Sequence, residues 1–421
     1  MLRTVITVAC LFALTVSLDA EPWPQWRGPR RDGVSKEKGL PTHWSADSVL
    51  WRLKLPGMGG ATPCIWEDKI FLTSDDGPEV VLMCISTTGK ENWRRALGKS
   101  WSRPVRADEG NAASPSPSTD GKLVYAFVGS GEFAAFDFTG TEQWRFNAAE
   151  RYGKFDIQFG MHTTPLLDGD RLYLPLIHSG GAWVIAIDKH TGQDVWKVER
   201  PSDGTDENEH SYASPALWRG EGRPSFLIVH GNDYTTGHRL EDGKEIWRVG
   251  ELNPRGQRYN RFLRFVASPV ATPELIVIPT AKNGVVVGLK PTAEGRIGPG
   301  SPHEAWRTER DTPDVPSPLV YEGLVYLCRE NGILLCLDAA TGKEYYRQRL
   351  HPGRYRASPV AADGKIYCTA RDGTVSVIEA GKTFKLLAAN KLPDQVSASP
   401  ALADGRIYLR GFDSLWAIGA K

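Results

Sequence analysis

Most of the chain consists of short apolar runs of four to seven residues, rich in Val, Ile, Leu and Tyr, separated by polar turns. Residues 397–418, SASPALADGRIYLRGFDSLWAI, show the pattern: two alternating apolar runs follow a Ser-Pro step and an Asp-Gly turn. Alternation with a period of two is typical of half-buried strands, and Gly, Asp and Asn at the ends of the runs are typical of hairpin turns. No helical periodicity lies between the runs. The pattern therefore predicts an all-β fold.

The same order of signals repeats along the chain. Each copy begins with a small-x-Pro tripeptide, and successive prolines of these tripeptides lie 41 to 54 residues apart. A repeat of this length suits one four-stranded blade, so eight copies predict an eight-bladed β-propeller over residues 49–421. The tripeptides are ATP 61–63, ASP 113–115, TTP 163–165, ASP 213–215, ASP 267–269, PSP 316–318, ASP 357–359 and ASP 398–400.

The last hairpin of a copy has a turn glycine followed four residues later by an aromatic ring. Residues 337–346, LDAATGKEYY, contain TGK, but a phosphate-binding loop needs glycine where Leu337 stands and a hydroxyl where Glu344 stands. The stretch is therefore predicted to be an outer hairpin in which Gly342 makes the turn. We expect each such ring to wedge against the adjacent blade. The predicted docking residues are Trp93, Trp144, Trp196, Trp247, Trp306, Tyr346 and Phe384.

The eighth copy has only three strands of its own. Residues 49–57, VLWRLKLPG, resemble an outer strand and lie ahead of the first tripeptide. Pairing this strand into the last blade would close the ring and leave no open sheet edge. The sequence therefore predicts closure by an N-terminal strand.

Residues 1–20 have the features of a signal peptide. Arg3 precedes an almost wholly apolar stretch, residues 4–16, and Ala20 offers a small residue for cleavage. No later stretch is apolar for 18 residues, so no transmembrane segment is predicted. With 51 Lys and Arg against 50 Asp and Glu, the overall charge gives no reason to expect nucleic-acid binding. We expect an exported protein, periplasmic or extracellular.

Five cysteines remain beyond the leader, and their odd number leaves at least one without a disulfide partner. Spacing alone assigns no pairing, and the chain has no adjacent Cys-Cys and no C-x-x-C. Buried thiols are the default expectation for Cys64, Cys84, Cys328, Cys336 and Cys368.

The repeat A-S-P-x-x-x-x-D-G-x-I-Y, followed by L-D-x-x-T-G-K-x-x-W, resembles the tryptophan-docking repeat of the pyrroloquinoline-quinone-type β-propellers. That superfamily includes quinoprotein alcohol dehydrogenases and the periplasmic propeller of the outer-membrane assembly machinery. The lead WPQWRGPRRDGVS, residues 23–35, resembles the start of secreted quinone-repeat-like propellers. We expect residues 21–48 to form a strap across the blades, with a ligand-facing lid as the alternative.

The resemblance implies two possible functions. Quinoprotein enzymes hold their cofactor with an adjacent-cysteine disulfide, a stacking tryptophan and acidic residues that bind Ca²⁺. This chain lacks the Cys-Cys pair, and its short repeats leave little room for the insertions that build such sites. We therefore predict a non-catalytic scaffold that binds a ligand or a protein partner and needs no cofactor. The alternative is an alcohol or sugar dehydrogenase that depends on pyrroloquinoline quinone with calcium.

The loops that enter the small-x-Pro strands, and the turns between second and third strands, are expected at one face around the central channel. They are rich in Arg, Tyr and His. Such a funnel suits a small anionic or sugar-like ligand, or an acidic peptide of a partner, through arginine contacts and ring stacking. The alternative is that these side chains only bridge neighbouring loops. The candidate ligand-binding residues are Arg106, His162, His178, Tyr212, His230, Asp233, Arg264, Lys282, Arg329, Arg356, Arg371 and Arg410.

Two further chemistries have no support in the sequence pattern. A metal site built from His162, His178, His210 and His230 has no ligand spacing to support it, so no metal is expected. No G-x-S-x-G elbow occurs, so no nucleophilic or other catalytic residue is assigned.

Overall fold

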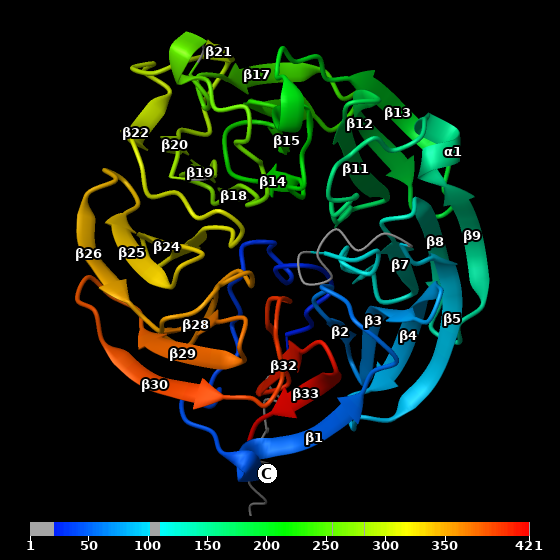
Figure 1. Ribbon diagram of the computed structural model, residues 1–421. Coiled ribbons are helices and arrows are strands. Elements are labelled where there is room, and N and C mark those ends of the chain that lie inside the picture. The colour runs from blue at the N-terminus through cyan, green and yellow to red at the C-terminus, as the bar shows by residue number, and fades with distance from the viewer. Residues whose placement is uncertain (1–20, 102–109, 255, 282, 421) are drawn as a thin grey trace, which may run out of the picture.

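The computed structural model describes residues 21–101, 110–254, 256–281 and 283–420. Eight antiparallel sheets stand in a ring around a central axis (Figure 1), which confirms the predicted eight-bladed β-propeller. We number the blades 1 to 8 in chain order, beginning with the blade that contains β2. Seven blades have four strands, and blade 4 has a fifth.

Each blade runs from an inner strand at the axis to an outer strand at the rim. The inner strands are β2 Cys64–Trp66, β6 Ser118–Thr119, β10 Leu166–Asp168, β14 Ala216–Trp218, β18 Val270–Ala271, β23 Leu319–Tyr321, β27 Val360–Ala362 and β31 Ala401–Ala403. The second strands are β3 Lys69–Asp76, β7 Leu123–Phe127, β11 Arg171–His178, β15 Phe226–Gly231, β19 Ile276–Ile278, β24 Leu324–Cys328, β28 Lys365–Thr369 and β32 Arg406–Arg410.

The third strands are β4 Glu79–Ser86, β8 Glu132–Asp137, β12 Gly181–Asp188, β16 Tyr234–Arg239, β20 Val286–Leu289, β25 Ile333–Asp338, β29 Thr374–Glu379 and β33 Ser414–Ile418. The outer strands are β5 Glu91–Lys99, β9 Glu142–Asn147, β13 Asp194–Glu199, β17 Glu245–Val249, β22 Glu304–Thr308, β26 Glu344–Arg349, β30 Leu386–Lys391 and, in blade 8, β1 Val49–Lys54. The short β21 Gly295–Ile297 pairs in parallel with β17. The helical turns are η1 Ala46–Ser48, α1 Ala148–Tyr152, η2 Asp206–Glu209 and η3 Gly256–Arg258.

Strand β1 lies beside β33, although the two are at opposite ends of the chain (Figure 1). The pairing is antiparallel and runs from Val49 opposite Ile418 to Lys54 opposite Ser414. Trp51 thereby reaches the position that tryptophan has in the outer strands of blades 1 to 5. Blade 8 is thus built from both ends of the described chain.

The rim is held together by aromatic rings that cross from one blade to the next. The Trp306 indole N–H of blade 5 donates to the Ala339 carbonyl in the outer hairpin of blade 6, at 2.8 Å. Gly342 lies under that indole with φ +69°, and a Cβ there would come within 2.7 Å of the ring. The glycine of LDAATGKEYY therefore makes the turn and also makes room for the preceding blade's tryptophan. The same donation joins Trp51 to Thr87, Trp93 to Phe138, Trp144 to Lys189 and Trp196 to Leu240.

The residue opposite each rim aromatic is small. In order round the ring, from blade 1 to blade 6 and then in blade 8, these residues are Cys84, Ala135, Ala186, Gly237, Gly288, Cys336 and Ala417. In blade 7 the large and the small residue change places: the outer strand β30 has the small Ala388, and the larger Val377 lies opposite it. Phe384 packs against an adjacent blade, as predicted, but it does so from the turn before β30 and not from the outer strand itself. Phe384 precedes β30 and packs edge-on against Tyr346 of blade 6, with ring centroids 5.5 Å apart.

Buried apolar side chains fill the spaces between adjacent blades, as Phe71 and Cys84 of blade 1 do with Val124 and Phe136 of blade 2. All five described cysteines are buried and free. No described helix is long and apolar enough to cross a membrane.

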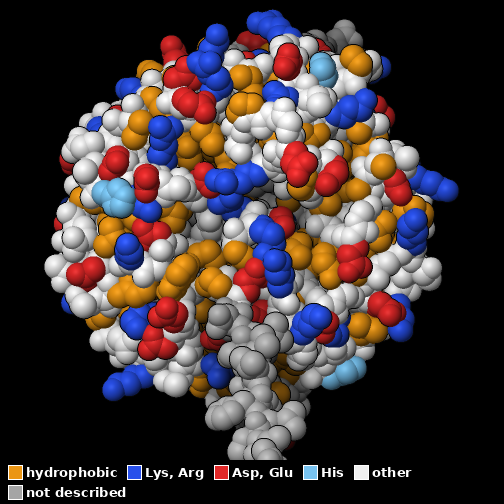
Figure 2. Space-filling view, turned by 180° about the vertical axis from the view of Figure 1, so that it is seen from behind, with side chains coloured by type: hydrophobic (Ala, Val, Ile, Leu, Met, Phe, Trp, Pro, Cys, Tyr) orange, Lys and Arg blue, Asp and Glu red, His pale blue; other side chains and the backbone are white. Residues whose placement is uncertain are grey.

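Residues 21–48 contact several blades, and we call this segment the strap. The Trp23 and Ile65 backbones exchange two hydrogen bonds at blade 1, and Val34 pairs in parallel with Ala361 at blade 7. Between these points Gln25 bonds Leu167 of blade 3, and Arg27 donates to the Pro318 carbonyl of blade 6 at 2.6 Å. Figure 2 shows the ring from behind, where basic and acidic side chains meet near the middle of the disc. The strap's contacts to inner strands on several sides of the ring carry it across the axis.

Candidate functional site

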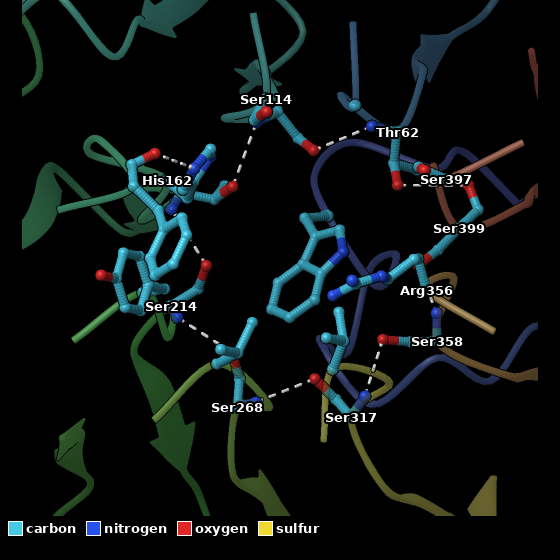
Figure 3. A pocket seen from close by; sticks show the side chains of 18 of the residues that line it. Thr62, Ser114, His162, Ser214, Ser268, Ser317, Arg356, Ser358, Ser397 and Ser399 are labelled. Carbon is cyan, nitrogen blue, oxygen red and sulfur yellow. Dashed lines mark hydrogen bonds between the residues drawn. The ribbon is translucent and has the colours of Figure 1, made fainter. Parts of the chain in front are cut away.

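A cavity of about 190 Å³ lies on the propeller axis. Its lower wall is a ring of hydroxyl residues, one from each blade, and each directly precedes the proline that starts an inner strand (Figure 3). Proline keeps the preceding residue extended and has no N–H that would need a partner at this crowded place. We call these residues the hydroxyl ring: Thr62, Ser116, Thr164, Ser214, Ser268, Ser317, Ser358 and Ser399.

The hydroxyl ring is joined by hydrogen bonds that run from blade to blade. The Thr62 N–H donates to the Ser116 hydroxyl oxygen at 2.9 Å, and the same bond repeats with lengths of 2.9 to 3.0 Å as far as Ser399. Between blades 8 and 1 the Thr62 hydroxyl instead donates to the Ser399 carbonyl at 3.2 Å. Within the described chain no acceptor engages the hydroxyl protons of the other seven members. These groups can donate to a molecule in the cavity.

In blade 2 the tripeptide lies two residues later than predicted. ASP 113–115 is wrong as the repeat step, because Ser116 of Pro115-Ser116-Pro117 occupies the hydroxyl ring. The spacing between the proline and the next turn glycine shows how this copy aligns with the others. Gly121 comes four residues after Pro117, just as Gly169 comes four residues after Pro165 in blade 3.

The upper wall is formed two residues before the hydroxyl ring, because alternate residues of an extended strand face the same side. At these positions the type of residue is no longer the same from blade to blade. The eight positions are Gly60, Ser114, His162, Tyr212, Val266, Val315, Arg356 and Ser397, and Phe159 and Arg264 also line the cavity. Chemistry therefore differs from one side of the channel to the other, and in Figure 3 His162 and Arg356 lie across the cavity from each other.

One side of the upper wall is aromatic. The His162 Nε2 lies 2.8 Å from the Phe159 carbonyl oxygen, and the ring packs edge-on against Trp101. Burial lowers the pKa of His162 to about 4, so the imidazole is neutral at neutral pH. Burial, together with the charge of Glu207, raises the pKa of Tyr212, which therefore keeps its proton.

The wall also has two ion-paired arginines, Arg264 beside the aromatic group and Arg356 across the cavity from His162. Arg264 lies 3.5 Å from Glu207 and 3.8 Å from Asp314, and its guanidinium covers the Phe159 ring at 5.1 Å. Arg356 pairs with Glu330 at 3.3 Å. Both guanidinium groups are thus positioned by carboxylates behind them.

Asp314 and Glu330 share a hydrogen bond as a carboxyl pair. Burial and then Glu330 raise the pKa of Asp314 to about 6, against the opposing effect of Arg264 and Arg356. Burial alone would raise the pKa of Glu330, but the Asp314 hydrogen bond and the charges of Arg356 and Arg354 lower it. Asp314 therefore holds the shared proton, and the pair loses it near pH 6.

The strap supplies one wall residue, Trp26. The neighbouring Arg27 is buried, with its guanidinium 5.7 Å from the Trp26 ring centroid and a second hydrogen bond to the Asp32 carbonyl at 2.7 Å. Burial lowers the pKa of Arg27 to about 10. The sequence predicted a strap and, as an alternative, a ligand-facing lid; the segment contacts several blades, and its Trp26 lines the cavity.

Four predicted residues meet at the cavity: His162, Tyr212, Arg264 and Arg356. Three others lie outside it. Asn253 and Tyr259 donate to Asp233 at 2.9 and 2.7 Å, which secures the loop after blade 4. His230 is buried against Thr235 at 2.6 Å, with a pKa lowered to about 3 by burial and then by Arg200, and His178 accepts the Gly180 N–H at 3.1 Å.

Three predicted arginines bridge neighbouring blades instead of facing the cavity. Arg329 pairs with Asp311 at 2.7 Å, and Arg371 covers the Phe412 ring at 4.6 Å. Arg410 is fully buried and donates to the Gly57 carbonyl and the Ser74 hydroxyl, both at 3.2 Å; burial lowers its pKa to about 9. Arg106 and Lys282 lie outside the described residues.

The cavity does not fit a calcium-bound quinone. Hard cations such as Ca²⁺ prefer carboxylate oxygens, and the lining residues that the structure describes include neither Asp nor Glu. Across the described chain no three His, Cys, Asp or Glu side chains are placed to hold a metal ion. The acidic groups nearby are committed to Arg264 and Arg356.

The fold and its aromatic docks define a propeller of the tryptophan-docking, pyrroloquinoline-quinone-repeat class. The family model described as outer membrane protein assembly factor BamB matches residues 79–327 and 295–409, and the chain belongs to this family. No curated protein matches the chain significantly.

Solved structures share the fold at low sequence identity. BamB from Moraxella catarrhalis is 13% identical with a TM-score of 0.62, over 89% of this chain and 97% of that one. Quinohemoprotein alcohol dehydrogenase from Comamonas testosteroni is 14% identical with a TM-score of 0.68, over 95% and 81%. A europium-containing methanol dehydrogenase is 13% identical with a TM-score of 0.67, over 94% and 90%. Since these proteins include an assembly factor and enzymes, the likeness shows the fold alone.

Proposed function

We propose that the protein is an exported, non-catalytic scaffold that holds a partner or a small ligand at the mouth of its central cavity. The observation that carries the proposal is the upper wall, where an eightfold-repeated frame presents neutral aromatic residues and two ion-paired arginines. Binding sites combine apolar surface with a few fixed polar groups in this way.

The protonation states of the wall residues support binding over proton transfer. An efficient general base has a pKa near the working pH, whereas His162 has a pKa of about 4 and Tyr212 stays protonated. Arg264 and Arg356 are held by Glu207, Asp314 and Glu330. Side chains with such fixed protonation states and positions can bind a charged group or the surface of a partner. The family's description as an assembly factor agrees with a role in interaction.

A photo-crosslinking side chain at position 262 tests the scaffold proposal. Phe262 is 61% exposed, and its carbonyl accepts the Arg264 N–H at 3.1 Å, so the residue lies in the loop that leads into the cavity. We expect irradiation of producing cells to give one defined adduct from this position. The matched control is Val195 on β13, an apolar rim residue that is 43% exposed and should give none.

A second measurement tests the non-catalytic part. Purified protein is mixed with pyrroloquinoline quinone, Ca²⁺ and a redox dye, and alcohols or aldoses are added. We expect neither a thermal shift nor dye reduction. If any of these substrates is turned over, the protein is a quinoprotein dehydrogenase and the scaffold proposal is wrong. If positions 262 and 195 give equal adducts, the partner does not dock at the mouth of the cavity.

A further inference from the structure

The hydroxyl ring has unused hydrogen-bonding capacity of one particular kind. A hydroxyl oxygen has two acceptor lone pairs and one proton. In seven members of the ring one lone pair accepts the preceding blade's N–H, at 2.9 to 3.0 Å. A circle of groups that can each donate and accept once more suits a molecule with hydroxyls around its own edge.

The walls above this ring add two further requirements. Tyr212, Phe159 and Trp26 present aromatic surface, which suits the C–H face of a sugar ring. Arg356 faces the cavity across from His162 (Figure 3), and a guanidinium with five N–H donors recognises a carboxylate. The cation is held in place by Glu330 at 3.3 Å, so little ordering is needed when an anion binds.

The cavity volume limits the size of such a molecule. A cavity volume of about 190 Å³ suits a small ligand such as a single six-membered ring with its substituents. A longer chain would have to continue through the mouth.

We propose that the cavity binds one hexuronate residue, with its hydroxyls at the hydroxyl ring and its carboxylate at Arg356. This inference rests on the proposed function, since it names the ligand of the same non-catalytic site. Neutral sugars lack the anion, and simple carboxylates lack the polyol, so the two wall chemistries together select an acidic sugar.

The charges behind the wall predict how binding depends on pH. Arg264, Arg354 and Arg356 face Glu207, Asp314 and Glu330, which gives three cations against three carboxyl groups. The pKa of Asp314 is about 6, and below this pH the cluster carries a net charge of +1; above it the charge is zero. His162 stays neutral in this range. Hexuronate binding should therefore tighten as the pH falls from 7.5 to 5.5.

The test titrates the purified protein with galacturonate and glucuronate by calorimetry at pH 5.5 and 7.5. Glucose and acetate are the single-feature controls, and a trigalacturonate arm separates a free sugar acid from the end of a polysaccharide. We expect saturable binding of a hexuronate, severalfold tighter at pH 5.5, and at least tenfold weaker binding of glucose and acetate. Arg356→Gln should weaken hexuronate binding about tenfold or more, because a charge-assisted bond is lost.

Arg349→Gln is the matched control, since Arg349 lies exposed on the outer strand of blade 6 and donates to the Asn331 carbonyl at 2.8 Å. A second variant, Ser268→Ala with Ser317→Ala, removes two ring hydroxyls in case Arg356→Gln fails to fold. Equal affinity for glucose and glucuronate, or hexuronate binding unchanged in folded Arg356→Gln, would overturn the proposal. If position 262 gives a defined adduct but no hexuronate binds, the ligand assignment is wrong and the scaffold proposal stands.

Discussion

The rim and the channel of this propeller are built from the same repeat but use it differently. At the rim, an aromatic ring, a turn glycine and a small opposing residue recur from blade to blade, as Trp306, Gly342 and Gly288 show. In the channel the hydroxyl ring is equally regular, but two residues above it the side chain changes in type around the ring, from Gly60 to His162, Tyr212 and Arg356. Regular positions hold the ring together, and the positions where the repeat varies make one part of the cavity wall chemically different from another.

The largest effect is expected in blade 8, where β1 pairs with β33. Deletion of residues 49–57 removes β1, so blade 8 loses its outer strand and β33 becomes an open edge. We expect aggregation or a poorly folded protein, measured by size-exclusion chromatography and thermal unfolding. A deletion variant with an unchanged melting temperature would show that β1 does not close the ring.

A pair of tryptophan variants compares rim and channel directly. Trp306→Ala removes a buried indole and its bond to Ala339, and we expect a loss of about 3–5 kcal/mol in the free energy of unfolding. Trp26→Ala removes a partly exposed indole that lines the cavity, and it should cost about 1 kcal/mol. Chemical denaturation measures both. Equal losses would mean that Trp26 is as structural as the rim rings.

The smallest effect is expected behind the cavity wall, at Asp314. Its folded pKa of about 6 lies above the ordinary value of 3.8, so its stabilising contribution is present at low pH and is lost as the pH rises through 6. Asp314→Asn removes that charge and can still donate to Glu330. At pH 7.5 we expect the variant to be more stable by on the order of 1 kcal/mol, and the difference should shrink as the pH falls toward the ordinary pKa of 3.8.

Melting temperatures between pH 4.5 and 7.5 measure this difference. The lowered pKa of Glu330 has the opposite sign and acts only as the pH falls below its ordinary value of 4.5, so it lies outside this window. Parallel curves for the native protein and Asp314→Asn would contradict the shared-proton pair.

The propeller was predictable because its signals are local and repeated. Strand alternation, small-x-Pro steps and hairpin glycines lie within single blades, and they determined blade number and the docking role of Trp93 and Trp306. Errors arose where a copy departs from the pattern. The doubled proline run hid the register at Ser116, and the Val377–Ala388 exchange left the outer strand of blade 7 without a ring, so that Phe384 packs from the turn before that strand.

The site was only partly predictable, because it depends on which way each side chain points. Arg356 and Arg410 both come from arginine-containing segments near the small-x-Pro steps and turns, yet one lines the cavity and the other is buried between blades. The two-residue offset from the hydroxyl ring would have separated His162, Tyr212 and Arg356 from the candidates that lie outside the cavity. Trp26 and the Asp314–Glu330 pair required the folded chain, since residues far apart in sequence meet there.

The hydrogen bonds of the hydroxyl ring also have a direction. Seven of them point the same way around the axis, from each blade's amide to the next blade's oxygen, and only the Thr62–Ser399 contact runs backwards. Because these bonds run from blade to blade around the ring, their dipoles lie tangentially and contribute almost no field along the axis. Attraction of a charged guest is therefore left to the arginines above. The one reversed bond coincides with the place where both ends of the chain meet, so the circle has its weakest link where the disc is expected to open first during unfolding.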